Sequence, residues 1–525
     1  MAKKVTLSSV SLIFACGTAL FSDGYANNVI GSGSMTITVL KRIYGTGSGG
    51  ITTNYSTTLS SVAFAGIVVG MFTFGYLSDK AGRKFGMMSA TGIIAVFSGL
   101  SSASSGVNHN LNGMLAMLIA CRFFLGIGVG AEYPCGSVSA SEQSEEEGIA
   151  KNSQHQWLVL ATTTMIDFGF VIGACVPLVL YWIFGDNHLR AVWRLSVGLG
   201  VVPAAGVFFW RLHMEEPNRY KRDSMKHVRI PYGLVIKRYW RGLLGISLVW
   251  FIYDFVTYPF GLYSSTITDT ITGGSSSLAV VLGWSAVINL FYMPGTIIGA
   301  FVVDRMGPKV TMITGLLVQA VIGFIMSGFY TQLSQHVAAF AVVYGIFLSF
   351  GEFGAWGCAI PPSFKLFLPR SRKLRWCSGC KVWTYCCAWP VLRCCSCCWK
   401  NRRICWNLVT DFGGSGSTKG NTGPFWVASG LGILSAIIVY FLVTPLDHDG
   451  MREEDAKVRS YPSRYPRHLH TLQRSSVNTS KRMVLTSHLW VFAKLKPCNI
   501  WKAKGQVQRS RLLTQRPKFS CAANI

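Results

Sequence analysis

The chain has 525 residues, of which 50% are hydrophobic and only 14% are charged. Soluble domains carry about 25% charged residues, so this composition argues against a soluble domain and indicates a protein of the lipid bilayer. The formal net charge of +27 is concentrated in two segments, because residues 365–411 hold ten Lys or Arg and one Asp, and residues 457–525 hold fifteen Lys or Arg and no acid. The rest of the chain is nearly neutral, and we expect no nucleic-acid partner.

Apolar runs of about twenty residues, the length of a membrane-spanning helix, recur along most of the chain. The first run contains Asp23 and Asn27 and lacks a small-residue cleavage site, so we expect a retained helix rather than a signal peptide. A basic loop at 211–241 separates the first six spans from the rest. We predict an all-α integral membrane protein with eleven spans, at residues 8–30, 60–78, 86–105, 114–138, 157–183, 193–210, 242–263, 279–303, 309–328, 337–357 and 425–444.

Two similar short segments follow the second and eighth predicted spans. They are GYLSDKAGRK at 75–84 and AFVVDRMGPK at 300–309, and each places an Asp, Asp79 or Asp304, before a short basic turn. A single copy could be a solvated charged turn, but two copies at matching places indicate two related halves. The basic turns, the amino-terminal lysines and the 211–241 loop all fall on one predicted side, which the positive-inside rule makes cytosolic.

This repeat resembles the major facilitator superfamily, whose two six-helix halves surround a central site. The resemblance implies the major facilitator fold, although the eleventh of its twelve helices is missing or corrupted here. It also implies a conformational motif made of Gly75, Asp79, Gly82, Arg83, Lys84, Arg122 and Asp304.

Acidic residues occur inside four of the predicted spans, where an ionisable group is costly and is a functional candidate. They are Asp23, Glu132, Asp167 and Asp254. A buried carboxyl without a partner can exchange protons near neutral pH, as a proton carrier must. A structural hydrogen bond to a neighbouring helix is the alternative for any one of them. Four acids against few buried bases favour proton coupling.

The seventh predicted span carries Trp250, Asp254 and Tyr258 at i, i+4 and i+8, within one arc of roughly 80° on a helix. An indole, a carboxyl and a phenol on one face suit a polar, ring-bearing ligand. Aromatic stripes also serve packing, and the spacing alone leaves both interpretations open.

Four strings resemble a narrower group, the phosphate:proton symporter branch of the superfamily, and within it the fungal glycerophosphodiester (glycerophosphoinositol) permeases. They are RFFLGIGVGAEYPCGSVSASE, MIDFGF, YDFVTYPFGLYSSTI and KGNTGPFW, and the resemblance covers about residues 5–354 and 412–455. It implies substrate-binding residues Tyr133, Asp167, Trp250, Asp254 and Tyr258, and proton-coupling residues Asp23, Glu132 and Asp254.

The resemblance further implies a carrier rather than an enzyme, one that imports glycerophosphodiesters with protons across the plasma membrane. We expect a monomer in contact with membrane lipid, without a cofactor or a metal. Symport of inorganic phosphate or a sugar is the alternative within the same class.

The family pattern stops at Gly354 and resumes near residue 412. The stretch from Cys377 to Trp406 holds nine of the sixteen cysteines. Four of these have the spacing C-x2-C-x13-C-x2-C, but it is shorter than that of a zinc ribbon and is interleaved with Trp, Arg and adjacent Cys pairs, so we expect no metal site. Each basic residue here would cost roughly 2.5–3.5 kcal/mol at the bilayer centre. Our hypothesis is a shifted reading frame near codon 355, restored near codon 411, with a second loss of frame in the tail.

The alternatives are a non-functional relative of the transporter and a membrane-tethered module for metal or nucleic acid.

The chain divides into six predicted segments. We predict an N-terminal half at 1–210, a cytosolic basic loop at 211–241, the first four spans of the second half at 242–354, an anomalous segment at 355–411, the last span and family C-terminus at 412–455, and an anomalous basic tail at 456–525.

Overall fold

The computed structural model describes residues 7–29, 35–45, 50–51, 53–144, 153–215, parts of 240–260, 277–366 and 418–443. Every described residue lies in one compact unit, Met1–Arg459. The described residues form helices and connecting turns with no strand among them, which confirms the predicted all-α class. The cysteine-rich stretch, the basic tail, most of the 211–241 loop, Asp254 and Tyr258 lie outside the described residues.

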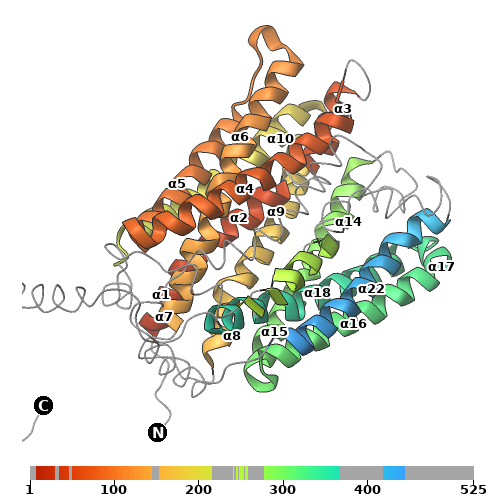
Figure 1. The fold of residues 1–525 in the computed structure, drawn as a ribbon. Helices are drawn as coiled ribbons and strands as arrows, with labels where there is room; N and C mark the ends of the chain where they lie inside the picture. Colours follow the sequence, from red (N-terminus) through yellow and green to blue (C-terminus); the bar gives the residue numbers. More distant parts are fainter. Residues whose placement is uncertain are drawn as a thin grey trace, which may run out of the picture. The chain divides into compact units, whose positions relative to one another are not determined.

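The helices before the basic loop form the N-terminal half. They are α1 (Leu7–Gly17), α2 (Ala19–Val29), α3 (Met35–Tyr44), α4 (Thr53–Ala81), α5 (Arg83–Ser102), α6 (Leu111–Glu132), α7 (Val138–Ser144), α8 (Gln154–Ala161), α9 (Thr163–Phe184), α10 (Leu189–Gly198) and α11 (Val201–Leu212). In Figure 1, α4, α5 and α6 run side by side.

The C-terminal half contains α14 (Leu278–Leu290), α15 (Tyr292–Met306), α16 (Pro308–Gly328), α17 (Tyr330–Ser334), α18 (Val337–Leu366) and α22 (Thr418–Leu442). An apolar helix at Ser247–Thr257 precedes them. Helices α16, α18 and α22 pack together (Figure 1).

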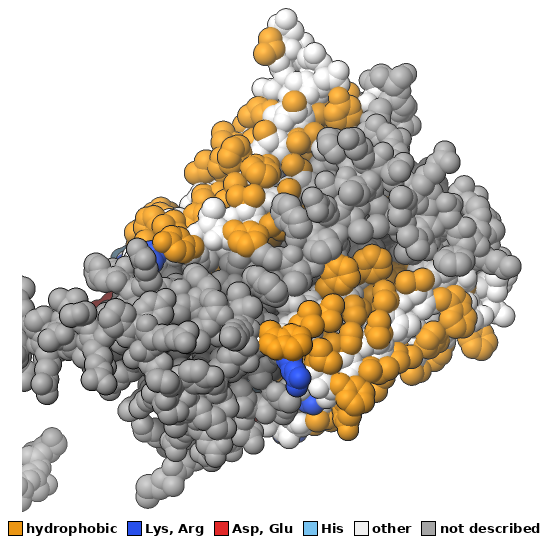
Figure 2. Space-filling view, in the orientation of Figure 1, with side chains coloured by type: hydrophobic (Ala, Val, Ile, Leu, Met, Phe, Trp, Pro, Cys, Tyr) orange, Lys and Arg blue, Asp and Glu red, His pale blue; other side chains and the backbone are white. Residues whose placement is uncertain are grey.

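Eight helical runs of the described residues are long and apolar enough to cross a membrane. They correspond to eight of the eleven predicted spans. The other three predicted spans correspond to the α1–α2 pair and to two shorter apolar helices, Ser247–Thr257 and Val337–Phe353. Hydrophobic side chains cover much of the described surface on the face that Figure 2 shows. Large hydrophobic residues are exposed in both halves, among them Val96, Phe209, Val321 and Phe441, which are 57–72% exposed. Such a surface fits lipid and not water.

Two spans are interrupted at a threonine whose side chain competes with the helix backbone. Thr18 lies between α1 and α2, and its hydroxyl bonds the carbonyl of Phe14. Thr162 lies between α8 and α9, and its hydroxyl donates to the Leu158 carbonyl at 2.6 Å. This back-bonding of threonine to the preceding turn bends helices. The fifth span is therefore two helices rather than one.

The two halves repeat the same local geometry after the second membrane span of each half, at the ends of α4 and α15. Gly82 and Gly307 both have positive φ, at 131° and 81°, and both precede the next helix. The ammonium of Lys84 donates to the Leu212 carbonyl at 2.7 Å, and that of Lys309 donates to the Tyr440 carbonyl at 2.8 Å. Each lysine thus binds the carboxyl end of the last helix in its own half, as expected for an internal repeat.

Close helix packing also recurs between the halves. Gly66 of α4 lies against the carbonyl of Phe123 in α6, and Gly295 of α15 lies against the carbonyl of Ser349 in α18. A Cβ at either glycine would collide with that carbonyl, so only glycine allows the approach. Small residues at matching positions set the helix spacing in both halves.

Candidate functional site

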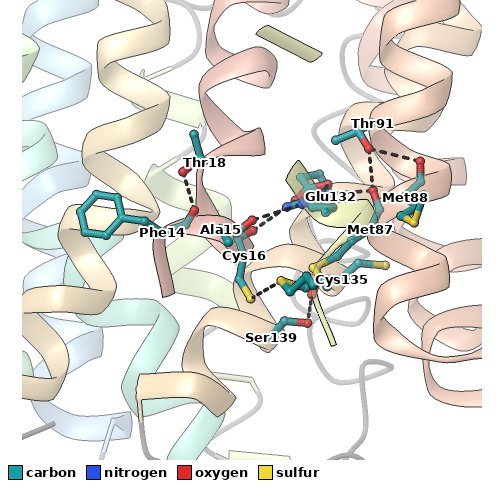
Figure 3. A network of polar contacts seen from close by, with 12 residues as sticks. Phe14, Ala15, Cys16, Thr18, Met87, Met88, Thr91, Glu132, Cys135 and Ser139 are labelled. Carbon is teal, nitrogen blue, oxygen red and sulfur yellow. Dashed lines mark hydrogen bonds and ion pairs between the residues drawn. The ribbon is translucent and has the colours of Figure 1, made fainter. Parts of the chain in front are cut away.

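A fully buried ion pair joins α6 to α11. The guanidinium of Arg211 donates two hydrogen bonds to the carboxylate of Glu132, at 2.5 and 2.8 Å, and both side chains are 0% exposed. Its remaining N–H groups donate to three backbone carbonyls, those of Ala15 at 3.2 Å, Cys16 at 2.6 Å and Met87 at 3.1 Å. Figure 3 shows Glu132 between the backbone of Ala15 and Cys16 on one side and Met87 on the other. All five donors of the guanidinium are occupied, so this charge is held in one geometry.

Asp23 of α2 lies close to this pair and is 0% exposed. It interacts electrostatically with both Glu132 and Arg211. Both of its carboxyl oxygens are buried without a hydrogen-bond partner among the described residues. Two buried acids therefore lie near a single guanidinium. That guanidinium is hydrogen-bonded to Glu132 and not to Asp23. A proton on Asp23 would balance the charges.

Tyr133 follows Glu132 directly and begins a π-helix at Tyr133–Ser137. Pro134 within this turn removes a backbone donor, which accounts for the widened turn. The Tyr133 side chain is 7% exposed and belongs to the same core cluster as Trp250 and Tyr253. Two residues predicted for the substrate site, Tyr133 and Trp250, are thus brought into one cluster.

Asp167 of α9 faces the C-terminal half. It is 1% exposed, lies against Thr296 of α15 and interacts electrostatically with Glu352 of α18. Glu352 in turn accepts a hydrogen bond of 2.9 Å from the hydroxyl of Tyr253. Asp167 and Glu352 therefore form a pair of carboxyls that joins the two halves.

A second contact between the halves lies at the start of α8. Asp304, at the end of α15, accepts a hydrogen bond of 2.8 Å from the backbone N–H of Gln156. Its other carboxyl oxygen lies 2.7 Å from Nδ1 of His155. A carboxylate at this position satisfies a free donor of the first helical turn and meets the positive end of the helix dipole. Asp304 therefore caps a helix of the opposite half.

The other predicted motif residues lie within the N-terminal half. Arg83 donates to the hydroxyl of Ser78 at 2.8 Å, and Arg122 donates to the carbonyl of Ala26 at 2.9 Å. Gly75 and Asp79 lie on α4, and the side chain of Asp79 is not among those that the structure describes. The sequence argument assumed few buried bases, and this was wrong, because Arg83, Arg122 and Arg211 are all at most 1% exposed.

Two important residues were absent from the sequence prediction. Arg211 was assigned to the start of the basic loop, but α11 continues through Leu212 and the loop begins later. A basic residue at the end of a span usually lies in water, and only its partners on other helices reveal its burial. Glu352 lies inside the predicted tenth span, so the rule that selected the other four acids would also have selected it.

Comparison with known proteins agrees with this architecture. The family described as "Sugar (and other) transporter" matches residues 10–230. Glycerophosphocholine permease GIT4 of Candida albicans is 38% identical over 472 residues, covering 87% of this chain and 83% of the relative. Major glycerophosphoinositol permease GIT3 of the same organism is 43% identical over 355 residues, covering 67% of this chain and 64% of the relative. The chain belongs to the glycerophosphodiester permeases of the major facilitator superfamily.

Solved structures of this superfamily share the permease fold. The proton:xylose symporter XylE bound to 6-bromo-6-deoxy-D-glucose superposes with a TM-score of 0.65 at 19% identity, covering 86% of this chain and 98% of the symporter. The predicted major facilitator fold and the multi-pass membrane architecture are confirmed. In this frame, the carboxyl pair and the Asp304 cap lie between the two halves of the permease.

Proposed function

We propose that this permease imports glycerophosphodiesters together with protons across the plasma membrane, and that it has no enzymatic activity. The observation that carries the proposal is the 38% identity to a glycerophosphocholine permease over 87% of the chain. A relative that transports inorganic phosphate, from Toxoplasma gondii, is 31% identical but covers only 52% of this chain. Phosphodiesters are therefore favoured over inorganic phosphate.

The substrate would bind between the halves, near Tyr133, Asp167 and Trp250, with Asp254 and Tyr258 as further predicted contacts. In support, Trp250 and Tyr253, which follow the basic loop, share a core cluster with Tyr133, which precedes it. Alternating access rocks one half against the other around such a site. Ligand contacts to both halves would change with each step of the cycle.

Asp23 is our candidate for the residue that carries the transported proton. Its carboxyl is buried beside an ion pair that already balances Glu132, so a charge on Asp23 would be uncompensated. Glu132 was predicted to share the proton route, and its bidentate bonds to Arg211 instead support a fixed role as the partner of that arginine. Protonation of Asp23 from outside and its release inside would couple proton flow to the movement of the halves.

The test is uptake of labelled glycerophosphoinositol by cells without their own glycerophosphodiester uptake. Cells expressing the chain, with residues 355–411 replaced by the matching segment of the Candida albicans relative, should take up the label faster at acid pH. An uncoupler should abolish that gain, and Asp23→Asn should remove the pH dependence. Competition by unlabelled phosphate and by glycerophosphocholine separates the substrate classes. Uptake that ignores both pH and uncoupler would refute proton coupling, and preferential competition by phosphate would refute the substrate.

A further inference from the structure

The carboxyl pair of Asp167 and Glu352 is an unusual feature of the bundle interior. The two acids come from opposite halves and are 1% and 6% exposed. Neither forms an ion pair with a basic side chain in the ranges that the structure describes. In addition, Oδ2 of Asp167 is buried and has no hydrogen-bond partner there. Burial and mutual repulsion disfavour the ionised form of both carboxyls, and a cation bound beside them would stabilise that form.

Aromatic rings lie next to this pair. The ring of Tyr253, whose hydroxyl bonds Glu352, lies 5.7 Å from the ring of Trp250 at an angle of 87°. The phenol of Tyr292 interacts electrostatically with both Asp167 and Glu352. These three rings are 3–7% exposed and carry no positive charge. The arrangement combines negative charge with the faces and edges of large aromatic side chains.

A cation bound over aromatic rings and next to carboxylates gains both Coulomb and cation–π energy, and quaternary ammonium ions are recognised in this way. A neutral polyol could bond the same oxygens but would gain neither the Coulomb energy nor the cation–π energy. A phosphate group would be repelled. The chemistry of the site therefore favours a ligand end that is cationic, bulky and weakly hydrated.

We propose that Asp167 and Glu352, with the rings of Trp250, Tyr253 and Tyr292, form a subsite for the quaternary ammonium headgroup of a zwitterionic phosphodiester such as glycerophosphocholine. This proposal rests on the proposed function in one respect, namely that the ligand is a phosphodiester. Because its two acids belong to different halves, the headgroup enters when the halves part and draws them together once it is bound. The phosphate then lies away from the pair, toward other residues of the central region.

The test is equilibrium binding of four probes to the purified full-length protein in which residues 355–411 are replaced by the matching segment of the Candida albicans relative. They are glycerophosphocholine, glycerophosphoinositol, choline, and the uncharged carbon analogue of choline, in which a tert-butyl group replaces the trimethylammonium. We expect choline to bind and to compete with glycerophosphocholine, and its uncharged analogue to bind at least about tenfold more weakly. An analogue that competes as well as choline, or a chain that does not bind choline, overturns the subsite. Choline binding without binding of either phosphodiester would instead overturn the proposed function.

Two matched variants test the residues themselves. Glu352→Gln keeps the shape and an acceptor for Tyr253, and Asp167→Asn does the same in the other half. Each variant should weaken the binding of glycerophosphocholine by about tenfold or more, and Glu352→Gln should change the binding of glycerophosphoinositol by less than about twofold. An equal loss for both ligands in Glu352→Gln, or no loss for either, contradicts the assignment. If neither variant folds, the comparison of choline with its uncharged analogue on the protein without either substitution decides the question.

Discussion

Arg211 and Glu132 show how a single pair of residues can hold four helices together. The guanidinium is bonded to a carboxylate of α6 and to carbonyls of α1 and α5, so its loss leaves a charge and several acceptors unpaired in a dry interior. We expect Arg211→Met to lower the free energy of unfolding by about 3–5 kcal/mol, the range for breaking one side of a buried ion pair. Unfolding of the purified protein in detergent, followed by circular dichroism, measures this change.

Two companion variants make that measurement specific. The double variant Glu132→Gln with Arg211→Met removes both charges and should recover most of the lost stability, because no unpaired ion remains. Arg190→Met, at an exposed arginine over the ring of Tyr44, should cost less than about 1 kcal/mol. If the single and double variants were equally unstable, packing rather than charge would explain the role of Arg211.

At the scale of the helix, the start of α8 depends on a carboxylate from the other half. Asp304→Asn removes the charge at this helix end while keeping a weaker acceptor for the N–H of Gln156. A hydrogen bond to a charged group contributes about 1.5–3 kcal/mol, of which the amide retains part. We expect amide hydrogen exchange in the peptide spanning 153–161 to become about tenfold faster, corresponding to about 1.4 kcal/mol.

The matched control for this variant is Asp186→Asn, the same change at an exposed aspartate in the turn at Asp186–His188, where Tyr181 is its partner. It should leave exchange in α8 unchanged. Unchanged exchange in Asp304→Asn as well would mean that the contact between α8 and α15 does not hold the halves together.

At the scale of the whole molecule, we predict that the chain with its own residues 355–411 does not transport. The superfamily fold needs an eleventh helix, and residues 365–411 offer ten basic residues, Pro369 and Pro390 in its place. Without that helix the last span, α22, would cross the membrane in the wrong direction or leave apolar surface uncovered. Surface protein and glycerophosphodiester uptake should both be lower than for the same chain with this segment replaced by that of a relative. Equal uptake by the two would make the cysteine-rich stretch a working part of the protein.

The sequence by itself determined the membrane class, the two related halves and the family. Spans of about twenty apolar residues are long, and their signal does not depend on which helices become neighbours. The repeated motif is local as well, because the positive φ of Gly82 and of Gly307 and the basic turn after each lie within ten residues of sequence. Four strings of sequence were enough to indicate the glycerophosphodiester permeases.

Only the tertiary structure decided which charges meet. Glu132 and Arg211 are far apart in the chain, as are Asp304 and His155, and no pattern in either segment indicates its partner. Asp23 and Glu132 appeared equivalent as buried acids, yet one is bidentately paired and the other has no hydrogen bond among the described residues. The energy of a buried charge depends on atoms within a few ångströms, and those atoms come from helices that only folding brings together.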